Sequence, residues 1–310
     1  MNKRKRFVLS GQTASGKNFI GAHAARDLPI EIISLDSMKV FKYMDIGTAK
    51  PTAEEQECAK HWMINVCEPK DYFDANMFYE MSEKIAQDIE SRGKHVLYVG
   101  GTPMYLRIIQ NKMFEGPAAD DAFRDKLRAE IKQDGLLKLH AKLSKIDPEA
   151  VEKIHENDEM RIIRALEVFE LTGQKISELQ TQQEPRDDVD FINFGIFWER
   201  PVLYERINDR NNEMFNAGWV EETKTIKETH GFGFQSAKAL GYKEILTMFL
   251  TDEKTYDELV ETVAMNIRRF AKRQMTWFRK FNMHWLTMDS EKSFDIVIKE
   301  LNNTLKNEID

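Results

Sequence analysis

The sequence has 310 residues, of which 42% are hydrophobic and 31% are charged, and its formal net charge is -7. This length fits one large domain or two of medium size, and the composition is that of a globular protein. The negative charge excludes a protein that coats nucleic acid indiscriminately, although local basic patches remain possible.

Cysteine usage and hydropathy narrow the class of protein further. The two cysteines, Cys58 and Cys67, cannot build a disulfide framework, and the seven histidines do not show the spacing of a zinc site. No stretch approaches the roughly 18 consecutive apolar residues of a membrane-spanning helix. We therefore expect a cytoplasmic protein without membrane contact.

A phosphate-binding loop follows the first predicted strand. The apolar run Phe7–Leu9 leads into the sequence GQTASGKN, and a helical pattern follows. The two glycines allow a tight turn whose N–H groups point at one anion, and the lysine adds a positive charge. The predicted phosphate- or diphosphate-binding residues are Gly11, Gln12, Thr13, Ala14, Ser15, Gly16, Lys17 and Asn18. Asn18 occupies the position where a Ser or Thr usually binds Mg²⁺, and an amide oxygen can also ligate this ion.

Further strands alternate with helical patterns, which predicts a parallel sheet. We expect strands at Glu31–Leu35, His95–Val99 and Phe191–Trp198. Ligands of such sheets bind beyond the carboxyl ends of the strands. The residues that follow these ends are Asp36, the Gly100–Thr102 segment and Arg200. By itself, Asp36 suits a helix cap or a Mg²⁺ ligand as well as a general base.

The character of the sequence changes after residue 116. Residues 117–186 show helical patterns and no strand candidate, so we predict an all-helical insertion between the two parts of a P-loop core, 1–116 and 187–310. Within the predicted helix Asp158–Leu171, Arg161 and Arg164 share a face. By themselves these two arginines favour a solvated surface over RNA contact.

A second basic feature lies on the long predicted helix Tyr256–Lys280. Its C-terminal half has no acidic residue and contains Arg268, Arg269, Lys272, Arg273, Arg279 and Lys280. The i, i+4 spacing gathers several of these cations on one face. This face suits pairing with acidic neighbours, and it suits contact with nucleic-acid phosphates.

Seven sequence blocks, in order, resemble those of the bacterial tRNA dimethylallyltransferases, also called tRNA isopentenyltransferases. The blocks are GQTASGKN, DSMKVFKYMDIGTAKP, VGGTPMYL, HENDEMRIIRALEVFELTG, RPVLYERI, ALGYKE and RRFAKRQMTWFR. Departures from the family pattern occur at Gln12, Asn18, Lys39 and Pro103. The resemblance implies a parallel α/β fold like that of P-loop nucleoside triphosphatases, with an inserted helical subdomain.

The resemblance also implies an activity. Such an enzyme transfers the dimethylallyl group from dimethylallyl diphosphate to N6 of adenosine 37 in tRNAs that read codons beginning with U, with Mg²⁺ as cofactor. The implied catalytic residues are Asp36, Lys17, Thr102 and Arg200. The implied tRNA-binding residues are Asp36, Ser37, Met38, Lys39, Thr102, Arg124, Met160, Arg161, Ile162, Ile163, Arg164, Lys238, Ala239, Leu240, Gly241, Tyr242 and Lys243, and Arg269, Lys272 and Arg273 join them on the basic helix. We expect a monomer that binds the anticodon stem-loop.

Three alternatives remain open from the sequence. An adenylate isopentenyltransferase would modify free AMP, ADP or ATP, but such an acceptor needs neither the insertion nor the basic helix. A P-loop small-molecule kinase is disfavoured by Asn18 and by the lack of an evident acceptor site. A catalytically weakened RNA-binding relative is suggested only by Asn18, since Lys17, Asp36, Thr102 and Arg200 are all present.

Overall fold

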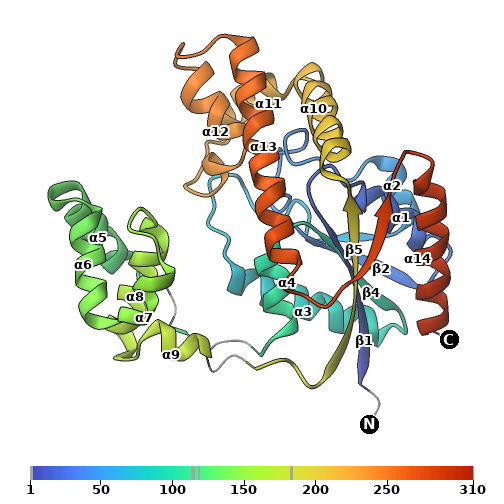
Figure 1. The fold of residues 1–310 in the computed structure, drawn as a ribbon, viewed down its shortest axis with the longest axis horizontal. Coiled ribbons are helices and arrows are strands. Elements are labelled where there is room, and N and C mark those ends of the chain that lie inside the picture. The colour runs from blue at the N-terminus through green and yellow to red at the C-terminus, as the bar shows by residue number, and fades with distance from the viewer. Residues whose placement is uncertain (1–2, 113–115, 118, 182–183, 310) are drawn as a thin grey trace. The chain divides into compact units, whose positions relative to one another are not determined.

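The structure is a computed structural model that describes residues 3–112, 116–117, 119–181 and 184–309 (Figure 1). The chain forms two compact units. Unit 1 comprises Met1–Gln110 and Asp187–Asp310, and unit 2 comprises Asn111–Arg186. The second unit is thus inserted into the first along the chain. The boundary expected at residue 116 adjoins residues outside the described ranges.

Unit 1 is built on a six-stranded sheet in which each described strand pairing is parallel. The strand order is β3-β2-β4-β1-β5-β6. The strands are β1 (Arg4–Gly11), β2 (Ile30–Leu35), β3 (His61–Trp62), β4 (His95–Gly100), β5 (Val189–Trp198) and β6 (His284–Met288). The parallel α/β fold expected from the sequence is confirmed, and the short edge strands β3 and β6 are additions to it.

Helices cover both faces of this sheet, and the alternation of side chains along the strands separates the two contacts. On one face, Gly21 of α1 approaches so closely that a Cβ there would lie 2.9 Å from Val99 of β4. On the other face, the buried Arg6 of β1 pairs with Glu83 and Glu90 of α3. The sheet is therefore buried on both sides, which explains why its central strands are almost continuously apolar.

The helices of unit 1 follow the strands in sequence (Figure 1). They are α1 (Lys17–Ala25), α2 (Ala53–Cys58), α3 (Ala75–Ser91), α4 (Pro103–Gln110), α10 (Arg200–Asn216), α11 (Trp219–Thr229), η1 (Ser236–Lys238), α12 (Tyr242–Glu244), η2 (Ile245–Phe249), α13 (Tyr256–Phe278) and α14 (Ser293–Ile309). None of the helices in the described ranges is both long and apolar enough to cross a membrane.

Unit 2 is entirely helical in its described part and has its own hydrophobic core. Its helices are α5 (Asp121–Asp134), α6 (Leu136–Ile146), α7 (Pro148–Lys153), α8 (Glu159–Thr172) and α9 (Ile176–Thr181). Helix α8 ends at Gly173, which takes the left-handed conformation with φ 70° that a helix stop favours.

A buried carboxylate joins α5 to α8 inside unit 2. Glu167 is fully buried and accepts hydrogen bonds from Arg124 Nε at 2.7 Å, from Arg164 Nη1 at 2.6 Å and from the backbone N–H of Asp120 at 2.8 Å. Burial raises the pKa of Glu167, but these hydrogen bonds outweigh it and hold the pKa below the ordinary value of 4.5. The charged form therefore stabilises the unit.

We predict that Glu167→Gln lowers the free energy of unfolding by about 3 kcal/mol at neutral pH, because it leaves two arginines around a neutral amide. A group with a depressed pKa stabilises the fold above its unfolded pKa and loses that effect as pH falls through its folded pKa. The difference between wild type and variant, measured by urea denaturation, should therefore shrink as the pH falls below the ordinary Glu value of 4.5. Glu170→Gln on the exposed side of α8 is the control, and a pH-independent difference would contradict the prediction.

Candidate active site

The P-loop, residues 11–18, connects the carboxyl end of β1 to the first turn of α1. Ala14 and Gly16 take left-handed conformations, with φ 61° and 82°. A side chain at Gly16 is also excluded by space, because its Cβ would lie 2.3 Å from the ring of Phe294. The first turn of a helix leaves its N–H groups without acceptors inside the helix, so this loop is built as an anion site.

Lys17 provides the positive charge at this loop. Its Nζ donates a hydrogen bond to the carbonyl of Gln12 at 3.1 Å. The pKa of Lys17 is lowered to about 7, mainly by burial; the positive charges of Lys39 and Arg210 contribute to this decrease, and Asp36 opposes it. A bound anion would remove this penalty and favour the charged ammonium.

Two arginines of α10 contact the P-loop from the other side. Arg206 Nε donates to the carbonyl of Ala14 at 3.1 Å, and Arg210 Nη2 donates to Thr13 Oγ1 at 2.8 Å. Their i, i+4 spacing places both on one face of the helix. Arg200 is exposed at the start of α10, directly after β5, and its assignment to the diphosphate site stays a prediction. Among the described residues, the arginine contacts to this loop come from the two positions further along the helix.

Two buried glutamines join the P-loop to α13. Gln274 Oε1 accepts from the N–H of Thr13 at 2.8 Å, while its Nε2 donates to the carbonyl of Gly101 at 2.5 Å. Gln12 Nε2 donates to the carbonyl of Ala271 at 2.8 Å. These bonds fix the P-loop against the β4 end and against the buried face of α13.

Asp36 and Thr102 meet at the same edge of the sheet, since β2 and β4 are parallel neighbours. Oδ1 of Asp36 accepts from the N–H groups of Met38 at 2.9 Å and of Lys39 at 3.3 Å. Thr102 Oγ1 accepts from the N–H of Ser37 at 3.2 Å. One carboxylate oxygen of Asp36 thus closes the turn after β2, and the described contacts leave Oδ2 available.

The loop of residues 44–51 is held beside α1 by an acidic side chain that the sequence analysis did not identify. Glu222 of α11 accepts from the N–H groups of Asp45, Ile46 and Gly47 at 3.0, 2.8 and 3.3 Å. At the other end of this loop, Asn18 Nδ2 donates to the carbonyl of Ala49 at 3.4 Å. This orientation leaves Oδ1 of Asn18 free as an oxygen ligand, which suits a hard cation such as Mg²⁺.

Comparisons with known proteins identify the family. The sequence model of IPP transferase matches residues 39–281. A tRNA dimethylallyltransferase of Acetivibrio thermocellus is 42% identical over 303 residues, with 95% of each chain covered. The tRNA isopentenylpyrophosphate transferase of Bacillus halodurans is 36% identical with a TM-score of 0.72, over 99% of this chain and 97% of that one. The chain belongs to the IPP transferase family.

A eukaryotic dimethylallyltransferase acting on tRNA has the same fold, with a TM-score of 0.82 and 25% identity over 98% of this chain and 79% of that chain. Membership of the IPP transferase family makes this protein a prenyl transferase, which decides against the kinase alternative. The P-loop described above therefore belongs to a prenyl transferase and not to a kinase.

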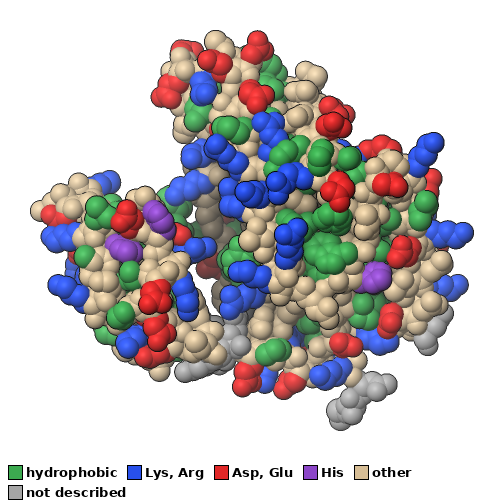
Figure 2. Space-filling model, viewed as in Figure 1, with side chains coloured by type: hydrophobic (Ala, Val, Ile, Leu, Met, Phe, Trp, Pro, Cys, Tyr) green, Lys and Arg blue, Asp and Glu red, His purple; other side chains and the backbone are tan. Residues whose placement is uncertain are grey.

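The basic face of α13 is exposed, as the helical pattern predicts. Arg269, Lys272 and Arg273 are all exposed, and Figure 2 shows Lys and Arg side chains gathered over this helix. Arg268 differs from them because it pairs with Glu261 at 3.0 Å and bonds Asn208. The exposed cations are available to bind phosphates, whereas Arg268 stabilises the fold.

Residues 238–243 also include both exposed cations and buried residues. Lys238 and Lys243 are exposed, with Lys238 Nζ 3.5 Å from the ring centroid of Phe234. Ala239, Gly241 and Tyr242 are buried, and Leu240 is partly buried. The Tyr242 hydroxyl donates to Glu222 at 2.6 Å. The side chains of Ala239 and Tyr242 therefore pack in the core, and RNA contact by these two residues and by Gly241, which has no side chain, stays a prediction that involves the backbone.

The expected RNA-binding residues of unit 2 also include both exposed and buried side chains. Met160 and Arg161 are exposed near the start of α8. Ile162 and Ile163 are buried in the core of this unit, so their side chains are not at its surface. Arg124 and Arg164 are partly exposed and both bind Glu167; the Arg124 pair joins α5 to α8, and the Arg164 pair lies within α8.

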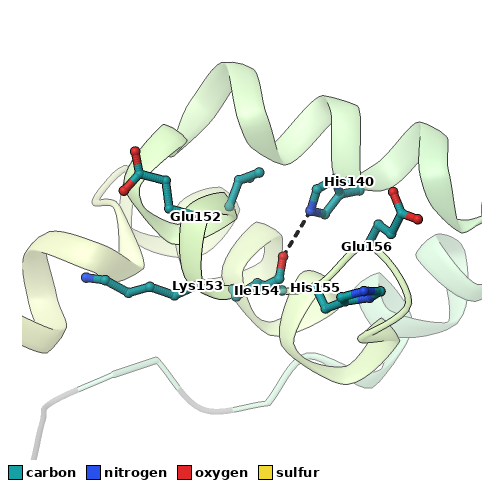
Figure 3. Close-up of a pocket in the computed structure, with 7 residues that line it drawn as sticks. His140, Glu152, Lys153, Ile154, His155 and Glu156 are labelled. Carbon is teal, nitrogen blue, oxygen red and sulfur yellow. Dashed lines mark hydrogen bonds between the residues drawn. The ribbon is translucent and has the colours of Figure 1, made fainter.

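Unit 2 also has a shallow hollow of about 380 Å³ (Figure 3). It is lined by His140, Val151, Glu152, Lys153, Ile154, His155 and Glu156. Nε2 of His140 lies 3.0 Å from the carbonyl of Ile154 and is engaged there. Across the described ranges, no group of three or more His, Cys, Asp or Glu side chains is placed to hold a metal ion.

We predict that Arg210→Gln weakens the binding of inorganic pyrophosphate about tenfold, because a charge-assisted donor is lost beside the P-loop. Lys227→Gln removes one positive charge from the exposed side of α11 and should change the dissociation constant less than twofold. Isothermal titration calorimetry at fixed ionic strength measures both. Equal losses in the two variants would mean that net charge, and not contact with the loop, governs anion binding.

Proposed function

We propose that this protein transfers the dimethylallyl group from dimethylallyl diphosphate to N6 of adenosine 37 in tRNA. The products are N6-(dimethylallyl)adenosine and diphosphate. The observation that carries the proposal is a cationic P-loop next to Asp36 and Thr102 in a chain whose relatives are named tRNA dimethylallyltransferases. We further propose tRNAs that read codons beginning with U, a monomeric enzyme and a cytoplasmic location.

The P-loop would hold the diphosphate of the donor. As the bond between the allylic carbon and the diphosphate oxygen breaks, the electron pair stays on that oxygen and negative charge builds on the leaving group. Lys17, Arg210 and the N–H groups at the start of α1 would stabilise this charge, which is the largest contribution expected from such a site.

N6 of adenosine would attack the allylic carbon and lose one proton. An exocyclic amine is a poor nucleophile, so its position against the carbon matters as much as its deprotonation. Asp36 would accept the proton through Oδ2, since Oδ1 closes the turn at Met38 and Lys39. Thr102 fixes that turn through the N–H of Ser37.

Asn18 fits a role in holding Mg²⁺ through Oδ1, because its Nδ2 donates to Ala49. When bound, the ion would neutralise charge on the diphosphate oxygens. The same assignment bears on the rate of dimethylallyl transfer. A single amide oxygen binds Mg²⁺ more weakly than a carboxylate does, and weaker binding of the ion lowers this rate.

For RNA, we propose that the exposed cations Arg269, Lys272 and Arg273 bind phosphates, together with Lys238 and Lys243. Met160 and Arg161 would contact the anticodon stem-loop from unit 2. The target base must leave the loop stack to reach Asp36.

A single-turnover assay tests the proposal, with an anticodon stem-loop RNA, dimethylallyl diphosphate and Mg²⁺, read by mass spectrometry. We expect one dimethylallyl group on RNA with adenosine at position 37 and none on the same RNA with guanosine there. Modification of free AMP would support the adenylate isopentenyltransferase alternative. Tight RNA binding without transfer would identify a weakened relative.

We predict that Asp36→Asn lowers the single-turnover rate at least about 100-fold, the scale of general base catalysis. The amide keeps an oxygen for the N–H groups of Met38 and Lys39, so the turn and the RNA affinity should be retained. Fluorescence anisotropy with the stem-loop provides that control. A rate near wild type would remove Asp36 from proton transfer.

A further inference from the structure

Lys39 is a buried lysine that the contacts described so far do not explain. Only 4% of it is exposed. Its backbone N–H donates to Asp36 Oδ1 and its carbonyl accepts from Asn65 N at 3.1 Å, but its Nζ has no hydrogen-bond or ion-pair partner among the described residues. Lys50, the next buried lysine along the chain, instead binds Phe41 O, Asp45 and Asn65.

An unpaired ammonium inside a protein is costly, because burial removes its hydration and supplies nothing in return. Burial lowers the pKa of Lys39, and Asp36 and Glu55 oppose this effect only in part. Neither carboxylate forms an ion pair with Lys39 in the described structure: Oδ1 of Asp36 closes the turn, and Glu55 accepts from the N–H of Thr52 at 2.8 Å.

The surroundings of Lys39 are cationic on the side of the P-loop. It lies in the turn directly after β2, next to Asp36, and its charge acts on Lys17. Arg210, which contacts Thr13, acts on both lysines. Lys17 and Arg210 contact the P-loop, and Lys39 is joined to Asp36 through its backbone, so three cations and one carboxylate lie at the same edge of the sheet. This excess of positive charge is unfavourable in the empty site and favours the binding of a polyanion.

We propose that Lys39 is a second lysine of the diphosphate site, and that its ammonium binds oxygens of the bound diphosphate together with Lys17 and Arg210. The proposal rests on the proposed function for the identity of the anion. The chemistry it requires is that of a compact group with two linked phosphates. The buried side chain distinguishes Lys39 from the exposed cations of α13, which suit the extended backbone of RNA.

A distinctive consequence is that stability and binding should respond to substitution in opposite directions. Lys39→Met keeps the length and removes the unpaired charge, so the protein without anion should melt at a temperature no lower than wild type. The same variant should bind inorganic pyrophosphate about tenfold more weakly. Lys84→Met, on the exposed side of α3, is the matched control for loss of one charge and should change neither quantity.

The experiment uses the full chain, with melting followed by scanning calorimetry and pyrophosphate binding by titration calorimetry, with and without Mg²⁺. The affinity for stem-loop RNA is measured in parallel and should change less than twofold. A lower melting temperature would mean that the ammonium stabilises the fold, and failure to fold, confirmed with Lys39→Gln, would mean the same; either result overturns the proposal.

Unchanged pyrophosphate binding would also overturn it, and a loss confined to RNA binding would assign Lys39 to an RNA phosphate. Pyrophosphate binding does not require dimethylallyl transfer. The proposed function therefore fails on its own if no RNA is modified while Lys39→Met still weakens pyrophosphate binding.

Discussion

The parallel direction of all six strands is the constraint on which the site depends. In such a sheet, the carboxyl ends of neighbouring strands share an edge. The P-loop after β1, Asp36 after β2 and Thr102 after β4 are therefore neighbours in space, although they are separated by tens of residues along the chain. Helix α10 starts after β5 at that edge, and its length lets Arg210 reach the P-loop.

Positive charge at this edge has an energetic cost when no anion is bound, and two buried amides hold the P-loop in place there. Gln274 and Gln12 satisfy backbone groups of the P-loop and of α13, so the loop is fixed before any anion binds. The charges of Lys17 and Lys39 are left without full compensation, and the pKa of each is lowered mainly by burial. A site that is strained by its own charge when empty, and relieved by an anion, is preorganised for stabilising a leaving group.

The two units use buried charged side chains in different ways. At the P-loop edge of unit 1, the buried lysines Lys17 and Lys39 lack carboxylate partners among the described residues, whereas in unit 2 Glu167 binds both Arg124 and Arg164. The first arrangement favours an incoming anion and the second stabilises a helical bundle. The contrast explains why a cluster of arginines in a sequence does not by itself identify a binding surface.

The sequence by itself determined the family, the parallel α/β fold, the P-loop and the positions of Asp36 and Thr102. These are local features, because glycines at a strand–helix junction and residues at strand ends follow from chain neighbours alone. The tertiary structure decided which charged side chains are free. Helix α10 brings Arg206 and Arg210 to the loop, Gln274 reaches it from α13, and Glu222 holds residues 45–47. Such contacts join residues far apart in the chain. Strand β6 depends on a contact of the same kind, because it pairs with the edge of β5. Pairing between distant side chains is a property of the packed molecule, so no local pattern reveals it.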